Sequence, residues 1–151
     1  MPKSMVALLA IAIGAGCIQA KYEDVSDLPA YGDLIAKQFK TQVALQVLGI
    51  TGDRNYRPVV DYYLLVGTPG IAGPEVVERS PLPAGSLVEV VEVSRCTNCA
   101  YLAIRIGVRI IRKDAYDEKA VFIDDRGDLV ETGADGRSTT LNPDRFKLIS
   151  K

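Results

Sequence analysis

Hydrophobic and polar residues alternate most regularly from Tyr101 to Ile111. The polar side of this alternation carries Arg105, Gly107 and Arg109. Successive side chains of a β-strand point to opposite faces, so the pattern predicts a long strand with one buried face. We expect the strand to bend at its glycine, which has no side chain to pack. Its apolar face consists of Leu102, Ile104, Ile106, Val108 and Ile110.

The same alternation predicts several shorter strands, separated by segments rich in turn-forming residues. The valine-rich segment from Ser86 to Ser94 alternates irregularly, which favours a strand that curls or bulges. In the last strand, Phe146 and Leu148 are expected to face inward. Residues 125–128 are expected to form a hairpin turn between their flanking strands. The other expected strands cover residues 41–50, 59–66, 120–124, 129–132 and 145–149.

Proline and glycine recur throughout the segment from Gly67 to Gly85. A proline cannot donate a backbone hydrogen bond to a neighbouring strand, and a glycine weakens local order. We therefore expect a long loop here, with at most a short strand at Glu75–Arg79. A loop of this length in a small domain is uncommon unless it has a function.

Short strands with turns between them, and no long helical period, predict an all-β fold. We expect residues 28–151 to form a single domain, a small barrel or sandwich of about six to eight antiparallel strands. Its layout, with long loops early and tight hairpins later, resembles the small SH3-like barrels of exported bacterial proteins.

The composition argues against several classes of function. The chain has 18 basic and 19 acidic residues, so it offers no excess of positive charge for a nucleic acid. It has no histidine, which excludes catalytic triads and metal sites built on imidazole. No nucleophile motif appears either. We expect neither an enzyme nor a bound cofactor or metal.

Cys96 and Cys99 enclose two residues between a valine-rich strand and an alternating strand. The ends of a four-residue turn lie within about 7 Å, which overlaps the separation that a disulfide tolerates. In an oxidising compartment this pair is expected to close into a structural disulfide. The alternative is a redox pair, although such pairs place the first cysteine at the start of a helix. Two thiolates without histidine are too few for zinc.

Arg105 and Arg109 lie two strand steps apart on one polar face, where they are candidates for binding a carboxylate or phosphate. The alternative is an ordinary solvated face. Arg126-Gly127-Asp128 spells an integrin-recognition tripeptide, but glycine and aspartate are also what a turn requires. Asp124, Asp125 and Asp128 do not match the spacing of a calcium loop.

The first seventeen residues have the layout of an export signal. Lys3 precedes an apolar run from Met5 to Ile13, and the small residues Gly14-Ala15-Gly16 lead to Cys17. A membrane-spanning helix needs about 20 apolar residues, so this run is too short to be one.

These residues resemble the lipobox of bacterial lipoprotein precursors. The resemblance implies that Cys17 is lipidated, that residues 1–16 are removed as a signal peptide, and that residues 17–27 are a tether. Because Ile18 is not aspartate, it also implies sorting to the outer membrane, facing the periplasm. Two alternatives remain open: ordinary secretion with cleavage after Ala20, and an uncleaved apolar anchor.

Together these features predict a lipid-anchored binding or scaffolding module of the bacterial cell envelope, with a protein or cell-wall partner. The alternative function is a periplasmic inhibitor or immunity protein that blocks a toxin or a wall-degrading enzyme through a projecting loop at residues 67–85. A protruding ordered loop would favour inhibition, and a concave groove would favour capture of a ligand.

Overall fold

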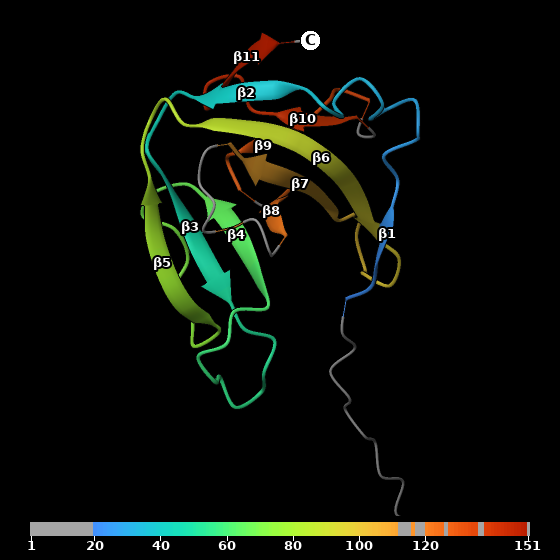
Figure 1. Cartoon of the computed structure of the whole chain (residues 1–151). Coiled ribbons are helices and arrows are strands. Elements are labelled where there is room, and N and C mark those ends of the chain that lie inside the picture. The colour runs from blue at the N-terminus through green and yellow to red at the C-terminus, as the bar shows by residue number, and fades with distance from the viewer. Residues whose placement is uncertain (1–19, 112–115, 117–119, 126, 136–137, 151) are drawn as a thin grey trace, which may run out of the picture.

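The chain forms an all-β fold, seen in a computed structural model (Figure 1). The structure describes residues 20–111, 116, 120–125, 127–135 and 138–150, and the signal-peptide and lipidation predictions lie outside them. The described residues contain no α-helix, and no helix among them is long and apolar enough to cross a membrane. The strands described are β1 (Tyr22–Asp24), β2 (Gln38–Thr41), β3 (Leu45–Ile50), β4 (Tyr62–Val66), β5 (Val76–Leu82), β6 (Leu87–Cys96), β7 (Ile104–Ile110), β8 (Val121–Asp124), β9 (Val130–Thr132), β10 (Thr139–Leu141) and β11 (Phe146–Ser150).

Nine of these strands form one sheet, in the order β11-β2-β6-β7-β8-β4-β3-β5, with β1 added beside β6. The pairing is antiparallel except between β4 and β8, which run parallel. β9 and β10 form a separate two-stranded sheet. The predicted all-β, mainly antiparallel class is therefore confirmed, with more strands than the sequence predicted.

The main hydrophobic core lies inside the curl of the large sheet, where β3, β4 and β5 run across the direction of β6 and β7 (Figure 1). Ile106 on β7 is at the centre of it, with 1% of its surface exposed. It pairs with Val93 of β6 on one side and with Ile123 of β8 on the other. Both neighbours are also buried, so β7 is a central strand of the fold.

A second, smaller hydrophobic cluster covers the opposite face of β3 and β4. Leu48, Ile50 and Leu64 are its buried members, with Tyr62 and Phe122 among the side chains packed around them. Both faces of these strands are thus covered, which explains why apolar residues occupy nearly every position of β3 and β4.

β6 bulges, as its irregular alternation predicted. Its pairing with β7 shifts register between Val90 and Glu92, so Val91 is left without a partner and 46% exposed. Gly107 lies opposite Glu92, and a Cβ atom there would come within 3.1 Å of the Glu92 Cβ. The glycine therefore allows the close approach of the two strands at the bulge.

The predicted tether is shorter than expected, because residues 22–25 belong to the fold. Tyr22–Asp24 forms β1 and pairs with residues 94–96 of β6. Val25 is buried, and its backbone N–H donates to the carbonyl of Val93 over 2.8 Å. A strand of three residues is too short to show an alternation of polar and apolar residues, so its sequence does not predict it.

The prediction of a long loop at residues 67–85 is wrong in its second half. Residues 76–82 form β5, an edge strand that pairs with β3 despite the proline at position 81. A proline is tolerated at a sheet edge because its missing donor faces away from the neighbouring strand. The segment therefore does not project as a single loop.

Four local expectations are also corrected. β8 and β9 do not form the predicted hairpin. Both edges of β8 are already paired, one with β7 and the other with β4, and β9 pairs with β10 instead. Leu102 is 52% exposed, since pairing of β6 with β7 ends at Ile104. Leu148 is 42% exposed on β11, an edge strand whose register shifts just after it. The predicted strand at residues 41–50 is divided, because the chain bends between Thr41 and Leu45.

Candidate functional site

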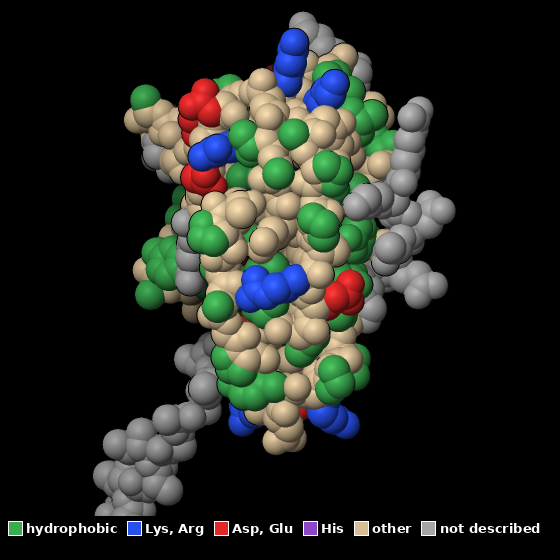
Figure 2. All heavy atoms as spheres, turned by 90° about the vertical axis from the view of Figure 1, so that its left-hand side faces the viewer, with side chains coloured by type: hydrophobic (Ala, Val, Ile, Leu, Met, Phe, Trp, Pro, Cys, Tyr) green, Lys and Arg blue, Asp and Glu red, His purple; other side chains and the backbone are tan. Residues whose placement is uncertain are grey.

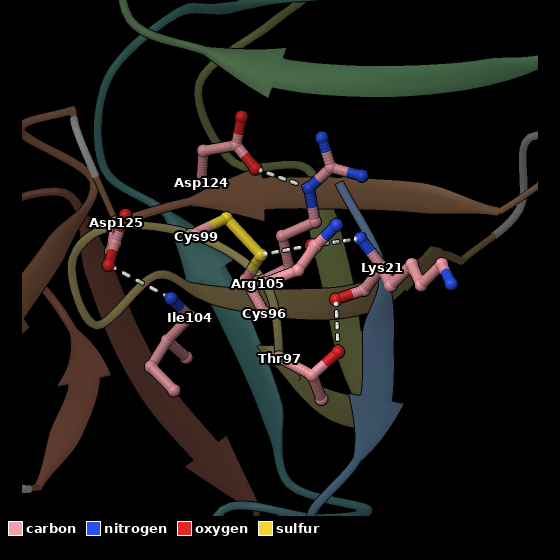
Figure 3. Close-up of a disulfide and its surroundings, with 9 residues drawn as sticks. Lys21, Cys96, Thr97, Cys99, Ile104, Arg105, Asp124 and Asp125 are labelled. Carbon is pink, nitrogen blue, oxygen red and sulfur yellow. Dashed lines mark hydrogen bonds and ion pairs between the residues drawn. A yellow bond between two sulfur atoms is a disulfide. The ribbon is translucent and has the colours of Figure 1, made fainter. Parts of the chain in front are cut away.

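Arg105, one of the two candidate anion-binding residues, is held inside the structure. Its Nε atom donates to Oδ1 of Asp124 over 2.8 Å (Figure 3). Its guanidinium carbon lies 4.3 Å from the ring centre of Tyr22, 5.2 Å from that of Tyr62 and 5.5 Å from that of Phe122. Only 19% of the side chain is exposed. Arg105 therefore covers the smaller hydrophobic cluster, and the solvated-face alternative is wrong for it.

Arg105 also remains charged. Burial by itself lowers the pKa of the guanidinium, but the carboxylate of Asp124, with smaller contributions from Tyr22 and Tyr62, raises the pKa above its ordinary value. The positive charge is thus matched by one carboxylate and by the faces of aromatic rings, an arrangement that stabilises a partly buried cation.

Arg109 has a different environment. Its side chain is 59% exposed, and one terminal nitrogen lies 2.7 Å from Oε1 of Glu89. Glu89 also accepts a hydrogen bond from Gln38 over 3.1 Å. Since Arg105 and Arg109 pair with different carboxylates, the structure does not unite them in one anion site.

We expect Arg105→Ala to lower the free energy of unfolding by about 1–3 kcal/mol, since it removes the ring contacts and leaves a partly buried carboxylate unpaired. The matched change Arg109→Ala removes an exposed ion pair and is expected to cost at most about 1 kcal/mol. Urea unfolding of both variants measures the difference. An equal loss of stability in the two would contradict the structural role of Arg105.

Cys96 and Cys99 form the predicted disulfide, with their Cα atoms 5.7 Å apart (Figure 3). The bond joins the end of β6 to the loop that leads to β7, and the described residues contain no α-helix at whose start Cys96 could lie. The same loop binds the chain just before β1: the Thr97 N–H donates to the carbonyl of Lys21 over 2.8 Å, and the Lys21 N–H donates to Oδ1 of Asn98 over 2.7 Å. The disulfide thus stabilises the loop to which Lys21, the residue just before β1, is hydrogen-bonded.

A concave groove is the best candidate for a binding site. It has a volume of about 450 Å³, within the range of clefts that bind small molecules. Leu64, Leu65 and Leu129 contribute to its lining, while Asp124 and Asp128 are its charged residues. The groove lies between residues 64–71 on one side and residues 124–129 on the other; its described lining residues are Leu64, Leu65, Val66, Gly67, Thr68, Pro69, Gly70, Ile71, Asp124, Gly127, Asp128 and Leu129.

The first wall of the groove is an ordered turn. Gly70 has a φ of +78°, and a Cβ atom there would lie 2.8 Å from Oε1 of Gln46, so only glycine fits without strain. Thr68 donates through its hydroxyl to the carbonyl of Ala44 over 3.3 Å. Arg79 of β5 donates to the carbonyl of Ile71 over 2.7 Å, which holds the rim in place.

The opposite wall is held by Asp128. Its Oδ2 atom lies 2.6 Å from a terminal nitrogen of Arg145, and its backbone carbonyl accepts a hydrogen bond from Asn142 over 2.7 Å. A Cβ atom at Gly67 would lie 2.9 Å from Oδ1 of Asp128, so the carboxylate approaches this wall closely because position 67 has no side chain. Asp128 therefore joins the two walls. A smaller hollow of about 170 Å³ adjoins it, lined in part by Val43 and Arg145.

The described lining of the groove is mostly apolar, with Thr68, Asp124 and Asp128 as its polar residues, a combination that suits binding of a ligand. Within the described part of the chain, no three carboxylates or cysteines lie close enough together to hold a metal ion. The exposed apolar side chain of Ile71 at its rim, 46% exposed, is available for contact with an apolar group of a ligand.

Searches against protein-family models, curated proteins and solved structures found no match for this chain. The groove must therefore be interpreted from its own geometry. Sequence reasoning assigned residues 67–71 to a functional loop but did not connect them with Asp124 or Asp128. The recurrence of glycine at positions 67 and 70 was the available signal, since it marks places where other groups approach the backbone closely.

Proposed function

We propose that this chain is a lipid-anchored module of the bacterial cell envelope that binds a partner protein. The anchor is Cys17, which follows the apolar run and the small residues of an export signal. Every strand described begins after this point, at Tyr22 or beyond, so removal of residues 1–16 takes away no strand of the fold. By resemblance to bacterial lipoproteins, the module faces the periplasm from the outer membrane.

The observation that supports binding is the groove between residues 64–71 and 124–129. A concave, largely apolar surface with a few fixed polar groups suits an inserted apolar side chain of a partner. The alternative, an inhibitor acting through residues 67–85, is less well supported. Part of that segment is an edge strand of the sheet, and residues 67–71 line the groove instead of projecting as one loop.

Photocrosslinking from the groove tests the binding function. We would place benzoylphenylalanine at Ile71, which is 46% exposed at the groove, and in a matched variant at Leu148, which is 42% exposed on β11. Irradiation of cells is expected to give a discrete crosslinked product from position 71 and none from position 148. The same products from both positions, or no product from position 71, would contradict a binding role for the groove.

A further inference from the structure

The loop at residues 51–61 projects from one end of the molecule. It joins β3 to β4 and forms the lower end of the fold in Figure 1. Two of its side chains are among the most exposed large hydrophobic residues that the structure describes: Tyr56 is 50% exposed and Val59 is 57% exposed. Figure 2, which keeps the same vertical axis, shows hydrophobic and basic side chains together at this lower end.

This loop is ordered by its own aspartates. The carboxylate of Asp53 accepts a hydrogen bond from the Asn55 N–H over 2.7 Å and pairs with Nε of Arg57 over 2.5 Å. Asp61 accepts a hydrogen bond from the Gly52 N–H over 2.6 Å. Within this frame Tyr56 has a φ of +52°, a conformation that residues with a side chain seldom adopt. The loop therefore holds an exposed tyrosine at a strained position, which is a feature of functional sites.

A second exposed apolar loop lies where the chain enters the fold. In the loop between β6 and β7, Tyr101 is 48% exposed and Leu102 is 52% exposed. The disulfide of Cys96 and Cys99 closes this loop, and its residues 97 and 98 bind the backbone of Lys21. Figure 1 shows this loop at the right, beside β1, and the loop at 51–61 below β3 and β4, so both lie in the lower half of the fold in that view.

The length of the chain before Lys21 determines how far the loop at 97–103 can lie from a lipid anchor. Four residue steps separate Lys21 from Cys17, and even a fully extended chain covers only about 14 Å in four steps. If Cys17 carries lipid, the loop that holds Lys21 is confined to a thin layer above the bilayer surface. Exposed tyrosine and aliphatic side chains in that layer match the composition of protein segments at the membrane interface.

We infer that the molecule rests on the lipid surface through two separate loops of its lower half in Figure 1, 51–61 and 97–103. Tyr56, Val59, Tyr101 and Leu102 enter the headgroup region there. This inference rests on the proposed anchoring at Cys17. In the first loop Arg54 and Arg57 are balanced by Asp53 and Asp61, so the contact is mainly apolar and depends little on salt.

The chain contains no tryptophan, so a single introduced tryptophan reports on its own surroundings. We would compare Tyr56→Trp and Tyr101→Trp with the control Leu148→Trp, on β11 at the opposite end of the fold (Figure 1). Because Cys96 and Cys99 are joined in a disulfide, Cys17 is the cysteine left for chemical coupling in protein produced without the lipid. The chain from Cys17 to Lys151, which retains every described strand, is coupled through it to maleimide-headgroup lipid in phosphatidylcholine vesicles.

Vesicles with brominated acyl chains quench a tryptophan that enters the membrane. Tyr56→Trp and Tyr101→Trp are expected to lose emission in brominated relative to unbrominated vesicles, at low and at high salt, while Leu148→Trp keeps the same emission in both. Equal emission for all three variants, or quenching of Leu148→Trp to the same degree, would overturn the inference and leave these loops facing water or a protein. The coupling is chemical, so the result is independent of whether cells lipidate Cys17.

Discussion

Replacing Ile106 with aspartate is expected to unfold the domain. Ile106 is 1% exposed on the central strand β7, between Val93 and Ile123. An aspartate there would place an unpaired carboxylate in the main core, at a cost of several kcal/mol. Since a domain of this size is stable by only about 5–15 kcal/mol, a loss of that size removes most or all of its stability. Circular dichroism during thermal unfolding measures the effect.

Val91→Asp is the matched control, because it introduces the same carboxylate in the neighbouring strand β6. Val91 lies at the bulge and is 46% exposed, so its carboxylate stays in water and the change is expected to cost less than about 1 kcal/mol. Similar melting temperatures for the two variants would contradict the assignment of Ile106 to the core and Val91 to the surface.

Strands that bury one face could be predicted from the sequence, because burial imposes alternation on the residues themselves. β7 is the clearest case: Ile104, Ile106, Val108 and Ile110 are all buried, as predicted. The irregular pattern of β6 likewise predicted its bulge at Val91. The disulfide was predictable because two residues between cysteines constrain the geometry locally.

Features that depend on pairing between distant segments could not be predicted in this way. β1 has three residues and exists because β6 offers it an edge, and β5 contains a proline that only an edge strand tolerates. The alternation around Arg105 placed it on a polar face, but the sequence does not show that Tyr22, Tyr62 and Asp124 surround it there. The groove could not be predicted for the same reason, since its two walls, residues 64–71 and 124–129, are far apart along the chain.

Lipid attachment at Cys17 is the central claim of the proposed function and has an all-or-none test. Cells producing the natural chain or the Cys17→Ser variant are supplied with a labelled fatty acid, and the purified proteins are compared. Cys96 and Cys99 are joined to each other, so neither offers a thiol for an acyl group in the folded protein. We expect label on the natural chain, with Cys17 as its first residue by mass spectrometry, and none on Cys17→Ser. An unlabelled natural chain, or equal label on both proteins, would contradict the account.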